Sequence, residues 1–226
     1  MINTLAGGGS LLTLPALIFA GLPADVANGT NRVGVFVQCT ASVATFHRAG
    51  RMPWKTVPRF LLPTVVGAVV GTLLALRLDA DAMKPAIGLV LLAALPTLFI
   101  RPPAETGRRR NLLGSAALFL AGAYGGFVQA GVGILLVLVL VGLSGLRLQP
   151  GNAVKLVLVG AFTLPALLLF TAFGLVDWVP GCALALGNMS GGILGSRLSL
   201  SIPDRAVRAI VAVMVAVSAT RLLDVW

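Results

Sequence analysis

Two short segments of the chain combine a glycine-rich backbone with neighbouring polar side chains, a pattern suited to binding an anion. The first is Ala6-Gly7-Gly8-Gly9-Ser10, and its counterpart is Ala130-Gly131-Val132-Gly133. A glycine-rich break exposes backbone N–H groups at the start of the following helix, where the helix dipole also favours negative charge. The pattern therefore predicts an oxyanion site at four backbone N–H groups, those of Gly8, Gly9, Val132 and Gly133.

A second pair of polar segments follows these glycines at equal distances. They are Asn28-Gly29-Thr30-Asn31-Arg32 and Asn152-Ala153-Val154-Lys155, and each opens a predicted helix. Either asparagine alone is explained by a role as an N-cap, but their recurrence beside a helix break makes a binding role an equal alternative. Arg32 and Lys155 either extend to the membrane interface or face the path of an anion. The predicted binding side chains are Asn28, Thr30, Asn31, Asn152 and Lys155.

Other polar residues of the predicted helices need no functional explanation. Interhelical hydrogen bonding is sufficient for Gln38, Gln129, Asn188 and Ser190, which are weaker candidates. The glycine pair Gly67-x-x-x-Gly71 is best interpreted as a close-packing point between helices.

The residues that the chain lacks exclude several classes of function. All seven acidic residues fall in predicted loops or at helix ends, so no carboxylate is predicted within the membrane as a proton relay or Na⁺ ligand. One histidine and two distant cysteines, Cys39 and Cys182, form no metal-ligand cluster, and the cysteines are interpreted as small buried hydrophobic residues. No catalytic set of residues is recognisable. We therefore expect no enzyme activity, no metal and no cofactor.

The composition is that of an integral membrane protein. Of the 226 residues, 58% are hydrophobic and 11% are charged, and the mean hydropathy is +0.99. A soluble domain of this size could not bury so much apolar surface. The net charge of +10 comes from basic residues in short connections between apolar runs, which indicates membrane topology rather than nucleic-acid binding. We expect a multi-pass protein of the cell inner membrane or plasma membrane.

The chain also contains a long internal duplication. A shift of 124 residues without a gap aligns Gly7 with Gly131, Gly9 with Gly133, Asn28 with Asn152 and Trp54 with Trp178. We predict a first transmembrane repeat at residues 1–102 and a second at 103–226, within a single integral membrane domain. Predicted helices of the second repeat are 112–128, 134–146, 152–173, 178–198 and 205–222. Those of the first are 10–22, 28–47, 57–78 and 83–100, and its initial helix is largely missing, so we expect the natural protein to begin upstream.

Charges in the connections predict how the two repeats are oriented. The connection after 28–47 carries Arg48, Arg51, Lys55 and Arg59, whereas its equivalent in the second repeat carries only Asp177. Positive-inside topology places the first of these connections in the cytoplasm. The sequence therefore predicts an all-α integral membrane protein of two inverted helical repeats, whose glycine-rich breaks meet near the middle of the membrane.

These motifs resemble the TauE/SafE family of sulfite exporters and anion permeases. The resemblance rests on Gly7-Gly8-Gly9-Ser10-Leu11-Leu12-Thr13-Leu14-Pro15-Ala16-Leu17, on Gly21, on Ala27-Asn28-Gly29-Thr30-Asn31 and on the glycine-rich copy at residues 125–133. It implies a secondary transporter, exporter or permease, for a small anion such as sulfite, sulfoacetate or another organosulfur or carboxylate anion. The second copy departs from the pattern, because Val154 and Lys155 stand where the first has Thr30 and Asn31.

The sequence leaves two functional hypotheses. An anion transporter needs a polar cavity between the repeats, whereas a membrane scaffold or assembly factor would have an interface without water between them. The expected partners are a small anionic substrate, the lipid bilayer and, as an option, a second copy of the chain in a homodimer, but no nucleic acid. Without intramembrane acids, we expect the anion to leave the cytoplasm along its electrochemical gradient without an obligatory coupling cation, although backbone carbonyls could still hold Na⁺.

Overall fold

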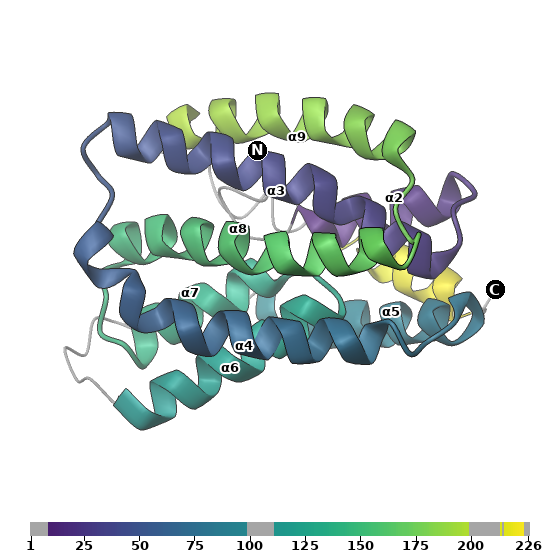
Figure 1. Cartoon of the computed structure of the whole chain (residues 1–226), viewed down its shortest axis with the longest axis horizontal. Coiled ribbons are helices and arrows are strands. Elements are labelled where there is room, and N and C mark those ends of the chain that lie inside the picture. The colour runs from purple at the N-terminus through teal and green to yellow at the C-terminus, as the bar shows by residue number, and fades with distance from the viewer. Residues whose placement is uncertain (1–8, 99–110, 199–212, 214, 224–226) are drawn as a thin grey trace.

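The computed structural model describes residues 9–98, 111–198, 213 and 215–223, and all regular structure in these ranges is helical (Figure 1). Elements of the first half are α2 (Ser10–Phe19), α3 (Ala24–Arg48), η1 (Trp54–Thr56), α4 (Pro58–Ala75), α5 (Ala80–Ala94) and η2 (Pro96–Leu98). Those of the second half are α6 (Asn111–Phe127), α7 (Val132–Gly142), α8 (Leu148–Ala172) and α9 (Trp178–Leu198). Residues 215–222 are also helical, whereas the start of the helix predicted at 205–222 lies outside the described residues.

Two predicted helix starts differ from the structure by one turn. The helices expected to open at Asn28 and Asn152 begin at Ala24 and Leu148, so neither asparagine is an N-cap. Proline explains both shifts. Pro23 is the residue that precedes α3, and Pro150 lies in the first turn of α8, where a missing N–H group costs no helical hydrogen bond.

The outer surface of the helices is suited to lipid. By length and composition, α4 and α8 could each cross a membrane. Large apolar side chains point outward, including Leu62, Leu112 and Val179, which are 72%, 86% and 82% exposed. So much exposed apolar surface is unusual for a soluble protein. In contrast, α2 with 10 residues and α7 with 11 residues are half-length helices, because about 20 residues are needed to span the hydrocarbon core.

Equivalent helices of the two halves run in opposite directions (Figure 1). The first-half helix α3 is antiparallel to α8, and α4 is antiparallel to α9. The half-length helices α2 and α7 both begin near the middle of the molecule and run outward to opposite ends. As a result, the connection between α3 and α4 lies at one end of the molecule and the equivalent connection between α8 and α9 lies at the other.

Charge is distributed unequally between these two ends. The α3–α4 connection and its flanking helix ends carry Arg48, Arg51, Lys55 and Arg59, and Arg147 directly precedes α8, which begins at the same end of the molecule (Figure 1). Every acidic residue in the described ranges lies at the opposite end, together with three basic ones: Asp25, Asp79, Asp81 and Asp177, with Arg77, Lys84 and Arg221.

Glycine allows α4 and α6 to pack with their backbones in contact. A Cβ atom added to Gly71 would lie 1.9 Å from the Ala123 carbonyl oxygen, and one added to Gly67 would lie 2.1 Å from that of Phe119. Gly122 and Gly126 of α6 make the reciprocal contacts, at 2.1 and 2.0 Å from carbonyl oxygens of α4. The structure thus confirms the interpretation of Gly67 and Gly71 as close-packing positions.

We predict that Gly71→Ala destabilises the protein, because the added methyl group would force the two helix backbones apart. Overpacking of this kind costs about 1–3 kcal/mol, which lowers the midpoint of thermal unfolding by several degrees for a chain of this size. Gly187→Ala in α9 is the matched control, since a Cβ there meets nothing within 4 Å. Equal midpoints for the two variants in detergent would contradict the close approach of α4 and α6.

Candidate functional site

The helical structure is interrupted between α6 and α7, inside the protein, and we call this interruption the break. Helix α6 ends at Phe127 and α7 begins at Val132. Gly131 has a φ of +74°, a left-handed conformation that favours glycine. The Tyr124 hydroxyl stabilises the turn by donating to the Ala130 carbonyl over 2.6 Å. A helix that ends within a membrane leaves carbonyl groups that need donors from the protein.

Side chains from the first half of the chain supply those donors. The three carbonyls involved belong to the last residues of α6: Gly125, Gly126 and Phe127. Asn28 Nδ2 donates to the last of these carbonyls over 2.8 Å. Arg32 donates through Nη1 and Nη2 to the two preceding carbonyls, over 3.3 and 2.6 Å. The Thr72 hydroxyl of α4 adds a bond of 3.1 Å to the Gly126 carbonyl. We call Asn28, Arg32 and Thr72 the α6 clamp.

Arg32 is a buried cation whose charge is used within the protein. Its side chain is fully buried, and its guanidinium carbon lies 4.6 Å from the centre of the Phe170 ring. Both the carbonyl end of α6 and the face of an aromatic ring attract a positive charge. The contacts that we find for Arg32 in the described structure are therefore with dipoles and a ring, and not with a carboxylate.

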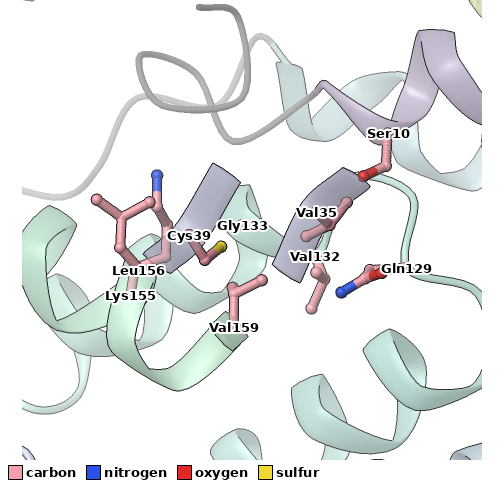
Figure 2. Close-up of a pocket in the computed structure, with 9 residues that line it drawn as sticks. All are labelled: Ser10, Val35, Cys39, Gln129, Val132, Gly133, Lys155, Leu156 and Val159. Atoms are coloured by element: carbon pink, nitrogen blue, oxygen red, sulfur yellow. The ribbon is translucent and has the colours of Figure 1, made fainter. Parts of the chain in front are cut away.

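A small pocket lies next to the break, on the side of α7 (Figure 2). It is lined by residues from α2, α3, α7, α8 and the break: Ser10, Val35, Cys39, Gln129, Val132, Gly133, Lys155, Leu156 and Val159. The space open to the centre of a water molecule is about 10 Å³, which is room for about one water. A larger ligand therefore requires the walls to separate.

Both halves of the chain contribute equivalent positions to this pocket. Val35 and Val159 are related by the same shift of 124 residues that relates Gly9 to Gly133. Ser10, which directly follows Gly9, faces the same space as Gly133. The pocket therefore lies where the two halves meet.

The electrostatic character of the pocket is positive. Lys155 is 2% exposed, and none of the lining residues is acidic. The first turn of α7, at Val132 and Gly133, brings the positive end of a helix dipole to the wall. Figure 2 shows Lys155 at one side of the pocket and Ser10 with Gln129 at the other. A buried cation near the first turn of a helix, in a space with room for about one water, is suited to holding an anion.

Three of the nine predicted binding residues line this pocket: Val132, Gly133 and Lys155. Gly8 lies outside the described residues. Gly9 immediately precedes α2, and its carbonyl accepts the N–H groups of Leu12 and Thr13.

The remaining predicted residues lie elsewhere in the helix packing. Asn28 belongs to the α6 clamp. The Thr30 hydroxyl accepts the Asp177 N–H over 2.9 Å and so ties α3 to the α8–α9 connection. Asn31 Oδ1 accepts from the Thr13 hydroxyl over 2.7 Å. Asn152 is half-buried in α8 and does not line the pocket.

Sequence reasoning did not select several residues of the pocket. Ser10 lies inside the first glycine-rich segment and Gln129 directly precedes the second, at Ala130, so a polar side chain within or next to the segment is the available signal. From the sequence alone, interhelical hydrogen bonding is sufficient to explain Gln129. Cys39 is buried as predicted, but the same prediction is wrong for Cys182, which lies at an exposed position of α9. Nothing in the sequence indicates that Cys39 lines a pocket.

The amino-acid sequence is similar to that of known membrane proteins. The family model described as "Sulfite exporter TauE/SafE" matches residues 1–222. The probable membrane transporter protein YfcA of Escherichia coli (strain K12) is 30% identical over 227 residues, which cover 98% of this chain and 84% of that protein. A probable membrane transporter protein of Haemophilus influenzae is 28% identical, with 94% and 86% covered, and one of Xylella fastidiosa (strain 9a5c) is 31% identical, with 88% and 79% covered. No solved structure matches the chain.

We predict that Arg32→Met destabilises the protein, because it removes two charged donors from carbonyls that water cannot reach. Loss of hydrogen bonds of this type costs about 1.5–3 kcal/mol. Arg32→Lys should restore stability only partly, since an ammonium group lacks the planar fork that contacts two carbonyls at once. Thermal unfolding in detergent measures both effects, with Arg51→Met in an exposed connection as the control. A clamp role is wrong if Arg32→Met unfolds at the temperature of the control.

Proposed function

Because the chain belongs to the sulfite exporter TauE/SafE family, we propose that it is a secondary transporter for a small anion such as sulfite, sulfoacetate or another organosulfur or carboxylate anion. That it is a membrane transporter follows from the family and from relatives named as probable membrane transporters. The choice of an anion is supported by one observation above all. Lys155 lines a buried pocket between the two halves, and no acidic residue lines that pocket.

The proposal includes two inverted transmembrane repeats, at 1–102 and 103–226. It is supported by the opposite directions of α3 and α8 and of α4 and α9 (Figure 1). Half-length helices that begin at the middle of the molecule and run outward are a recurring feature of transporters with inverted repeats. In this arrangement the substrate site lies between the repeats, near the middle of the membrane.

We orient the protein in the cell inner membrane by its charges. The end that holds the α3–α4 connection, which is basic and has no acidic residue in the described ranges, faces the cytoplasm under the positive-inside rule. The end with all the described acidic residues then faces outward. Helix α7, whose first turn lines the pocket, begins midway between these two ends of the molecule (Figure 1).

Transport requires the pocket to widen toward one side of the membrane at a time. In the described conformation it has room for about one water, so we interpret this conformation as occluded. Binding must remain modest, because an anion held too tightly would not leave. One elementary charge crossing 100 mV is worth about 2.3 kcal/mol, so a negative cell interior drives an anion outward without a coupling cation.

A membrane scaffold is the alternative function, and Lys155 distinguishes the two. We predict that Lys155→Met lowers saturable anion flux in proteoliposomes by about ten-fold or more, because it removes the charge-assisted contact to the anion. The same variant should unfold at an equal or higher temperature, since it also removes a buried charge without an acidic partner in the pocket. Lys55→Met, at an exposed position, is the control with the same change in net charge. A scaffold would show no flux of sulfite or sulfoacetate even in the wild type.

We further predict that the membrane potential alone drives transport. Flux of a monoanion out of vesicles clamped at −100 mV inside should exceed flux at zero potential, by a factor of at most about 50, which is the ratio that corresponds to 2.3 kcal/mol. Removing Na⁺ and the pH gradient should leave this flux unchanged. Flux that ignores the potential and requires a Na⁺ or proton gradient would refute uniport.

A further inference from the structure

The Gln129 side chain lies in the pocket wall (Figure 2). Thr163, which does not line the pocket, holds the Gln129 amide in one orientation. Gln129 Nε2 donates to Thr163 Oγ1. The Thr163 hydroxyl in turn donates to the Val159 carbonyl over 2.6 Å. A hydroxyl group has a single proton. Since that proton is used, Thr163 Oγ1 accepts from Gln129, and the amide nitrogen rather than the amide oxygen faces Thr163.

This arrangement leaves the Gln129 amide oxygen as a fixed acceptor. In the described part of the chain Gln129 Oε1 has no hydrogen-bond partner, and the residue is 1% exposed. Buried polar atoms without partners are uncommon in native proteins, and each one needs an explanation. A reversal of the amide would not remove the problem, because two oxygens would then compete for the one proton of Thr163.

The pocket therefore combines one positive charge with one acceptor that lacks a donor. Lys155 supplies the positive charge and Gln129 Oε1 is the acceptor. The Ser10 hydroxyl, which also lines the pocket, is able to donate or to accept a hydrogen bond. An anion that has only lone pairs satisfies Lys155 but leaves Gln129 Oε1 unpaired. An anion that also carries an O–H or N–H group is able to donate to Gln129 Oε1 as well, once the pocket has widened to admit it.

We propose that Gln129 is a specificity-determining residue that recognises a hydrogen-bond donor on the transported anion. Resting on the transport function proposed above, this names the substrate class as donor-bearing monoanions. Singly protonated oxyanions of sulfur and amino- or hydroxyl-bearing sulfonates belong to this class. Thr163 is a positioning residue, because it acts on the substrate only through the orientation of the Gln129 amide.

The probes for the test are sulfamate and methanesulfonate. Both are monoanions with one SO₃ group, and they have nearly the same shape, but sulfamate carries an NH₂ group where methanesulfonate carries a methyl group. Their flux ratio in proteoliposomes therefore isolates the donor from charge and size. We expect wild-type protein to transport sulfamate about ten-fold faster at limiting concentration, the ratio that one buried hydrogen bond provides.

Two variants test the residues that carry the proposal. Gln129→Leu should bring the flux ratio close to one while methanesulfonate flux persists. Thr163→Val, which removes the hydroxyl but keeps the shape, frees the amide to rotate and should lower the ratio as well. It also tests the proposal if Gln129→Leu does not fold. Gln38→Leu is the matched control, since Gln38 is buried in α3 but does not line the pocket; because a ratio does not depend on the folded fraction, it should keep the wild-type value.

The outcomes separate this proposal from the function on which it rests. Wild-type flux of sulfite and both probes, with a sulfamate-to-methanesulfonate ratio near one, overturns donor recognition and leaves anion transport in place. The wild-type ratio in both Gln129→Leu and Thr163→Val overturns it too. No saturable flux of sulfite, sulfamate or methanesulfonate overturns the transport function itself.

Discussion

The carbonyl groups exposed where α6 ends must find hydrogen-bond donors without help from water. In a membrane this requirement is strict, because lipid offers no donors. Asn28 and Arg32 from α3 and Thr72 from α4 meet it. All three come from the first half of the chain, whereas the broken helix belongs to the second. These hydrogen bonds therefore connect the two halves directly. They also hold the end of α6 in place, two residues before Gln129, which lines the pocket.

The close packing of α4 and α6 at glycine helps to hold the same hydrogen bonds in place. The carbonyl of Gly126 accepts the Thr72 hydroxyl, while the missing side chain of Gly126 lets the Ala68 carbonyl approach. A side chain at this position would push α4 away and take Thr72 out of hydrogen-bonding distance. Dense packing and polar satisfaction thus depend on the same glycine. This dependence is expected where helices associate without a hydrophobic driving force and must rely on close packing and hydrogen bonds.

Local patterns in the sequence were sufficient for the helices but not for the roles of polar residues. Apolar runs and the density of glycine locate most helices, but α3 and α8 begin one turn earlier than predicted, because Pro23 directly before α3 and Pro150 in the first turn of α8 mark the helix starts. The roles of Asn28 and Asn152 could not be separated, since their sequence contexts match and the partner of Asn28 lies 99 positions away. The duplication was also a poor guide to charge. Arg32 corresponds to Leu156, and Lys155 corresponds to Asn31, so each half places its cation at a different position.

The two buried cations differ in chemistry in a way that matches their surroundings. Arg32 presents a planar fork, and a fork suits two adjacent carbonyls at the end of a helix. Its charge is thereby balanced by dipoles of the protein itself. Lys155 presents a compact charge on a flexible stem, beside the first turn of α7 and with no acidic residue in the pocket wall. In the transport function that we propose, an anion that enters this space would supply a countercharge, and a single flexible contact would release it more readily than a rigid fork. Arg32, whose charge is balanced by dipoles of the fold, therefore holds the break in place, whereas Lys155, for which the described residues of the pocket wall provide no carboxylate, lies beside the space next to the break.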